Sequence, residues 1–180
     1  MSSVNFLVNT LFDLYIMVIL LRVWLQVARA DFYNPFSQFI VKATQPIVGP
    51  LRRVIPSLGS WDTATILFAF MVACLKIITL SLIMNAPFNP MMIAISGLVI
   101  LLTAVFKLIF WVLVLRAILS WVSQGRNPIE AVMIQLSEPL LAPVRRFIPA
   151  IGGLDLSMIV VLLGLQFVEL LVNDLLSRLF

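Results

Sequence analysis

The sequence predicts an all-α membrane protein whose four transmembrane helices form two parallel tandem repeats. Of the 180 residues, 62% are hydrophobic and only 11% are charged, whereas a soluble domain carries roughly 25% charged residues. Four apolar stretches reach about 20 residues or more, the length that crosses a hydrocarbon core roughly 30 Å thick. We expect helices there, because lipid satisfies no backbone hydrogen bonds and no stretch alternates at period two like a barrel strand.

An internal repeat covers nearly the whole chain. One connecting segment contains the run Pro50-Leu51-Arg52-Arg53-Val54-Ile55-Pro56, which recurs 93 residues later as Pro143-Val144-Arg145-Arg146-Phe147-Ile148-Pro149. The other matched positions, first copy before second, are Asn34-Pro35 with Asn127-Pro128, Pro46 with Pro139, and Asp62 with Asp155. Each copy therefore predicts a span, a basic amphipathic connection and a second span.

The repeat sets the expected boundaries. The first repeat is expected at residues 1–84, with spans at about 4–28 and 63–84 around an amphipathic segment at 35–56. The second is expected at 92–180, with spans at about 92–122 and 156–178 around an amphipathic segment at 128–149, after a short linker at 85–91. The first stretch has no basic n-region and no small-residue cleavage site, so we expect a retained span and not a removable signal peptide.

Basic residues outside the spans predict the orientation. All of them lie in the two long connections, except Arg178 near the end of the chain. We therefore expect a bacterial inner-membrane protein with cytoplasmic connections and both termini in the periplasm. The basic residues do not form one dense run with interleaved aromatics, so no nucleic-acid partner is expected.

The two connections are expected to begin as short helices at the membrane surface. Asn34 and Asn127 can cap helices that start at the proline after each of them. Apolar residues then recur at helical spacing, namely Phe36, Phe39, Ile40 and Ala43 in the first connection and Ile129, Val132, Met133 and Leu136 in the second. Two prolines in each connection are expected to stop or kink the helix: Pro46 and Pro50, and Pro139 and Pro143.

An arginine pair follows the prolines in each connection, Arg52-Arg53 and Arg145-Arg146. Anionic lipid headgroups attract each arginine near the surface by about 1 kcal/mol. We therefore expect a flat platform that binds an anionic bilayer surface. Re-entrant insertion, docking of a partner and a simple orientation signal are the alternatives.

Four charged residues lie at one depth inside the spans, roughly 21 to 23 Å from the connections at 1.5 Å per residue. They are Asp13, Lys76, Lys107 and Glu169. Charges in a membrane are costly without partners, so we expect two ion pairs. They can form across the repeats (Asp13 with Lys107, Lys76 with Glu169) or within each repeat (Asp13 with Lys76, Lys107 with Glu169). A polar site for an ion or a substrate group, and snorkelling of the charged side chains, are the alternatives.

The remaining polar residues of the spans have simpler expected roles. Arg22 and Arg116 lie near the connections and are expected to snorkel to the membrane boundary. Asp62 and Asp155 each precede a long apolar helix and are expected to cap it.

The composition excludes most familiar active sites. The chain has no histidine, and Cys74 is its one cysteine. Disulfides, Cys/His zinc sites, histidine-ligated haem and histidine acid–base catalysis are therefore excluded. We find no Gly-rich phosphate loop and no nucleophile paired with a base in the sequence. No catalytic residue, metal or cofactor is expected, and the chain is not expected to be an enzyme.

The repeated Asn-Pro helix, with its proline–arginine run and the aspartate after it, resembles the YggT family of bacterial integral membrane proteins, which is related to the YlmG proteins. The resemblance covers essentially the whole chain. It implies an accessory factor in osmotic-stress response or in potassium and ion homeostasis. Plastid and cyanobacterial relatives suggest a scaffold for membrane-complex assembly or cell division as the alternative, and a small ion transporter or channel subunit is a second one. Another membrane protein or a second copy of the chain is the expected protein partner.

Overall fold

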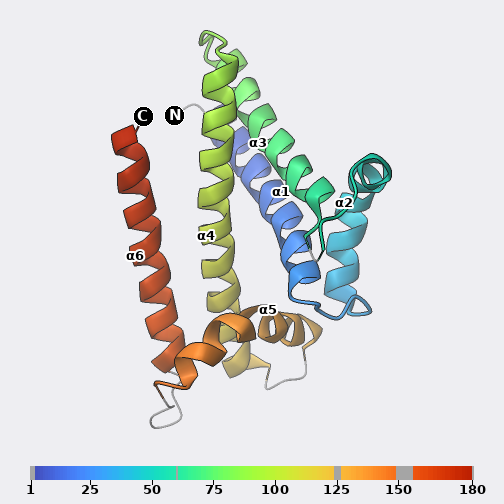
Figure 1. The fold of residues 1–180 in the computed structure, drawn as a ribbon, viewed down its shortest axis with the longest axis vertical. Coiled ribbons are helices and arrows are strands. Elements are labelled where there is room, and N and C mark those ends of the chain that lie inside the picture. Colours follow the sequence, from blue (N-terminus) through green and yellow to red (C-terminus); the bar gives the residue numbers. More distant parts are fainter. Residues whose placement is uncertain (1–2, 60, 124–126, 149–155, 180) are drawn as a thin grey trace. The chain divides into compact units, whose positions relative to one another are not determined.

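The computed structural model describes residues 3–59, 61–123, 127–148 and 156–179, which fold into six α-helices and no strand (Figure 1). The helices are α1 (Ser3–Val27), α2 (Pro35–Val54), α3 (Thr63–Ile83), α4 (Pro90–Val122), α5 (Pro128–Arg145) and α6 (Leu156–Leu179). Four of them, α1, α3, α4 and α6, are long and apolar enough to cross a membrane. The predicted all-α fold with four candidate spans is confirmed.

The chain divides into two compact units, Met1–Val105 and Phe106–Phe180. The division falls inside α4 and not at the 85–91 linker, because the first part of α4 packs on α3. A methyl group added at Gly97 would lie 2.9 Å from Cys74 Sγ and 3.3 Å from the ring of Phe70. Small residues permit such close approach of membrane helices. The division concerns packing, so the tandem repeat stays a prediction from the sequence.

In the first unit, α1 and α3 pack along each other (Figure 1). Ile16, Ile19 and Leu25 of α1 are fully buried, and α3 buries the small side chains Ala69 and Ala73. Because Ala69 and Ala73 are four residues apart, they lie on one face of α3 and let the neighbouring helix come close. The contact fixes the two spans that carry the polar groups described below.

Helix α2 packs against both α1 and α3. Its buried face consists of Ser37, Ile40, Thr44 and Val48, all at most 2% exposed. These positions recur at the three- and four-residue spacing of one helix face. We call the ends of α1 and α3 that flank α2, at Val27 and Thr63, the connector end of the first unit. Half of the buried face is hydroxyl-bearing, so α2 brings polar groups to that end.

The prolines do not stop either connecting helix. Helix α2 continues through Pro46 and Pro50, and α5 continues through Pro139 and Pro143. Each proline removes one backbone hydrogen bond and distorts the turn before it. Figure 1 shows that α2 and α5 each change direction along their length. Of the two expected effects, the prolines bend the helices without ending them.

The predicted apolar stripes of the two connecting helices have different surroundings. On α2, Ile40 is buried but Phe39 is 63% exposed. On α5, Val132, Met133 and Leu136 are all buried. In the second unit α5 packs against α6. Helix α2 therefore keeps an exposed apolar side beside its buried face, whereas α5 turns most of its apolar stripe into the protein.

Candidate functional site

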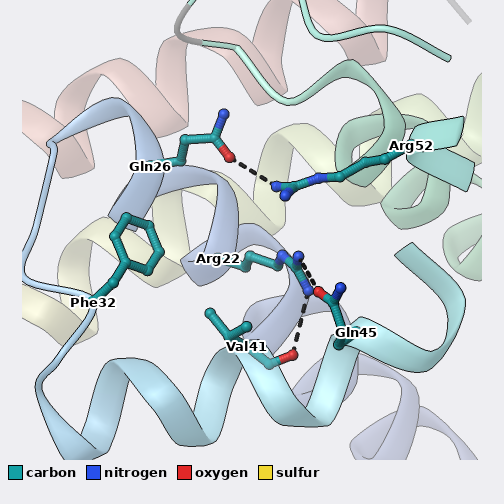
Figure 2. A pocket seen from close by; sticks show the side chains of 6 residues that line it. All are labelled: Arg22, Gln26, Phe32, Val41, Gln45 and Arg52. Carbon is teal, nitrogen blue, oxygen red and sulfur yellow. Dashed lines mark hydrogen bonds between the residues drawn. The ribbon is translucent and has the colours of Figure 1, made fainter. Parts of the chain in front are cut away.

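The guanidinium of Arg22 occupies the centre of the connector end. Arg22 lies in α1 and is 3% exposed. It donates hydrogen bonds to Gln45 Oε1 at 2.7 Å and to the Val41 carbonyl oxygen at 3.3 Å (Figure 2). It also donates to Thr44 Oγ1 at 2.7 Å. The expectation that Arg22 snorkels to the boundary is wrong, because α2 folds alongside α1 and supplies the acceptors there.

All three acceptors of Arg22 are neutral. Within the described residues, Arg22 forms no ion pair. A buried charge is costly unless an opposite charge compensates it, and hydrogen bonds to neutral groups compensate only in part. Three of the five N–H groups of Arg22 thus donate to neutral oxygens, and its charge has no anion in direct contact.

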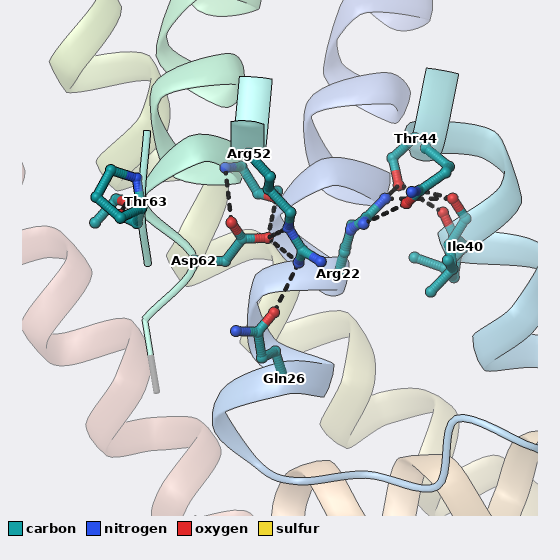
Figure 3. A network of polar contacts seen from close by, with 11 residues as sticks. Arg22, Gln26, Ile40, Thr44, Arg52, Asp62 and Thr63 are labelled. Atoms are coloured by element: carbon teal, nitrogen blue, oxygen red, sulfur yellow. Dashed lines mark hydrogen bonds and ion pairs between the residues drawn. The ribbon is translucent and has the colours of Figure 1, made fainter. Parts of the chain in front are cut away.

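Asp62 joins the three helices of the connector end (Figure 3). It is fully buried and is the N-cap of α3, where its side chain accepts a hydrogen bond from the Thr65 amide at 3.2 Å and another from the Thr65 hydroxyl. Arg52 of α2 forms an ion pair with the same carboxylate, and its guanidinium also donates to Gln26 Oε1 of α1 at 2.8 Å. The Asp62 carboxylate thus connects α3 with α2 through Arg52, and Arg52 also connects α2 with α1 through Gln26.

The environment of Asp62 favours its ionised form. Burial by itself raises the pKa of the carboxyl, but the hydrogen bonds from Arg52 and Thr65, together with the charge of Arg52, outweigh burial and hold the pKa below its ordinary value of 3.8. The carboxylate is therefore charged throughout the neutral range.

A cavity of about 410 Å³ opens between α1 and α2 beside these residues. Its lining consists of Arg22, Gln26, Phe32, Val41, Gln45 and Arg52 (Figure 2). Two cationic side chains and two amides thus line one hollow at the connector end. Guanidinium and amide N–H groups around one hollow suit a small anionic group.

The second unit contains a related arginine contact. Arg116 of α4 is 9% exposed and donates to Ser137 Oγ at 2.6 Å and to Glu138 Oε2 at 3.1 Å. Arg145 donates to Glu138 Oε1 at 3.0 Å. The Glu138 carboxylate therefore bridges the two arginines. Arg116, like Arg22, was expected to snorkel, and α5 supplies its acceptors in the same way.

The charged layer inside the spans is paired in the first unit. Asp13 Oδ1 lies 2.6 Å from Lys76 Nζ, and the side chain of Lys76 is only 9% exposed. Asp13 and Lys76 therefore form the ion pair expected within one repeat, and not the alternative pairs across the repeats. Lys107 and Glu169, both in the second unit, form no ion pair with each other.

The other predicted site residues lie at the caps and on the surface. Asn34 and Asn127 each accept a 2.9 Å hydrogen bond from the backbone amide two residues later. The remaining described ones are exposed: Arg53, Arg146, Pro46, Pro50, Pro139 and Pro143. Asp155, the expected cap of α6, lies outside the described residues.

Sequence reasoning missed the acceptors of the buried arginines. The signal was present, because Thr44-Gln45-Pro46 and Ser137-Glu138-Pro139 align at the 93-residue offset. In both triplets a hydroxyl precedes a side chain with a carbonyl or carboxyl group. A pattern within one helix assigns these residues to its polar side and contains no information about the arginine on the neighbouring span.

We expect Asp62→Asn to destabilise the protein by about 2–3 kcal/mol at neutral pH, because Arg52 then loses its anion. The pKa of Asp62 is lowered by folding, so its stabilisation is complete above its ordinary value of 3.8 and is lost as the pH falls through the folded value. Thermal unfolding in detergent at pH 7 and pH 3 measures the stability of the variant and of the parent. The variant should lose less stability in acid than the parent, and an equal loss would contradict the role of Asp62.

We expect Asp13→Asn to destabilise the protein by about 2–4 kcal/mol, because the buried ammonium of Lys76 is left without an anion. The double variant Asp13→Asn/Lys76→Met should recover most of the loss in thermal unfolding. Glu169→Gln is the matched control and should have a smaller effect than Asp13→Asn. A double variant no more stable than Asp13→Asn would show that the pair does not stabilise the fold.

Comparison with known proteins gives consistent relatives. The family model described as CCB3/YggT matches residues 1–83 and 95–176. An "Uncharacterized protein in proC 3'region" of Vibrio alginolyticus is 59% identical over 180 residues, covering 98% of this chain and 97% of the relative. The "Uncharacterized protein YggT" of Escherichia coli K12 is 52% identical over 177 residues, covering 98% and 93%. No solved structure matches. On these matches the chain belongs to the CCB3/YggT family.

Proposed function

We propose that the protein is a non-enzymatic, multi-pass component of the bacterial inner membrane that acts as an accessory factor in osmotic-stress response or in potassium and ion homeostasis. The observation that carries the accessory role is the Asp13–Lys76 pair, joined at 2.6 Å. An ion that crosses a membrane needs polar groups free to coordinate it. This pair uses its two charges on each other, which supports a structural element over a conducting one.

A scaffold for membrane-complex assembly or cell division is the second candidate. The exposed apolar side of α2 favours it, because Phe39 is 63% and Ile47 is 45% exposed, and exposed Arg53 lies on the same helix. Apolar anchors beside a cation suit contact with a partner membrane protein or with a second copy at the headgroup level.

The test of the accessory role combines flux with complementation. The purified full chain in liposomes should give no potassium flux above empty liposomes. The same gene should restore growth and potassium content after osmotic upshift in an E. coli strain that lacks its YggT relative. Flux that a folded Lys76→Met/Glu169→Gln variant abolishes would make the protein a conductor. Absence of any osmotic defect in the deletion strain would exclude the osmotic role.

The proposed orientation places α2 and α5 on the cytoplasmic side, following the excess of basic residues there. In a Cys74→Ala background, we expect a cysteine at Ser57 to resist an impermeant thiol reagent in intact cells. A cysteine at Asn85 should react, and both should react in permeabilised cells. The reverse pattern in intact cells would invert the proposed orientation.

A further inference from the structure

Two arginine pairs at matching sequence positions contact their carboxylates differently. In the second unit the Glu138 carboxylate contacts Arg116 at 3.1 Å and Arg145 at 3.0 Å. In the first unit the aligned residue is Gln45, which is neutral and accepts a hydrogen bond from Arg22. The anion that joins the arginines in the second unit is therefore missing from the first.

The first unit has a cavity where the second has its carboxylate contacts. Arg22 and Arg52 both line the hollow of about 410 Å³ between α1 and α2. Asp62 pairs with Arg52 and does not line the hollow. Two guanidinium cations and one carboxylate leave a net charge of +1 beside the cavity, and Arg22 is 3% exposed. A buried cation facing an open space favours an anion in that space.

We propose that this cavity binds a phosphate-bearing anion, held between Arg22 and Arg52 as the Glu138 carboxylate is held between Arg116 and Arg145. Guanidinium groups suit phosphate because their N–H donors match its oxygens in pairs. Gln26 and Gln45 use their carbonyl oxygens to accept from Arg52 and Arg22, so their amide N–H groups remain to donate.

The position of the cavity connects it with lipid headgroups. Its lining residues lie in the last turns of the apolar helix α1, in the segment that follows it and along α2. The phosphate can come from the headgroup of an anionic phospholipid or from a dissolved anion such as inorganic phosphate. Both sources present the same chemistry to the arginines, and the experiment separates them.

The experiment uses the delipidated full chain in a neutral detergent. Native mass spectrometry counts bound dioleoylphosphatidylglycerol against dioleoylphosphatidylcholine, and thermal unfolding is followed with inorganic phosphate against chloride at equal ionic strength. We expect one phosphatidylglycerol to bind in preference to phosphatidylcholine. A higher unfolding temperature in inorganic phosphate, without preferential binding of phosphatidylglycerol, would assign the site to a dissolved anion.

Two reciprocal variants make the test specific. Gln45→Glu gives the first unit the carboxylate that the second unit has, and should weaken anion binding roughly tenfold or more while keeping the unliganded protein folded. Glu138→Gln removes the carboxylate of the second unit and is the matched control, which should leave anion binding at the first-unit cavity unchanged. Unchanged binding in folded Gln45→Glu, or no preference for either anion over its control in the parent, would overturn the proposal.

Discussion

A guanidinium that is removed from water and buried between apolar helices requires hydrogen-bond acceptors. This requirement determines where α2 lies. Arg22 cannot be buried unless another segment brings oxygens to it. Helix α2 does so with Thr44, Gln45 and the Val41 carbonyl. The connection is thereby held as a packed third helix against α1 and α3. The same solution in the second unit, with Arg116 and Ser137, indicates that the arginine is the cause of the arrangement and not a by-product.

The contact at Arg22 places the rest of the connector end. Once α2 lies against α1, its last turn brings Arg52 to the first turn of α3, where Asp62 already caps the helix. The carboxylate then serves two purposes, because it satisfies backbone and hydroxyl donors of α3 and neutralises Arg52. Buried polar groups of this kind stabilise only when each is satisfied. The bends of α2 at its prolines let one helix reach both ends of this network.

The spans were predictable and the packing of the connections was not. Length and hydropathy fix the four long helices, and Asn34 and Asn127 fix the starts of α2 and α5, because these signals are local. The burial of Arg22 depends on a residue 22 positions away, Thr44, and a single-helix pattern cannot contain that information. The sequence also left open whether Asp13 pairs with Lys76 or Lys107, since one depth in the membrane suits both. Only the packing of α1 on α3 favours Lys76.

The two units differ in which of their charged residues have a partner of opposite charge. The first unit neutralises its intramembrane charges through Asp13 and Lys76 but leaves Arg22 at the connector end without a carboxylate in contact. In the second unit the Glu138 carboxylate contacts both Arg116 and Arg145, while Lys107 and Glu169 form no pair with each other. Desolvation makes an uncompensated charge costly in either place. Among the described residues, Arg22 in the first unit and Lys107 and Glu169 in the second have no oppositely charged side chain in contact. Duplicated sequence has therefore not produced duplicated sites, and the difference turns on single positions such as Gln45 and Glu138.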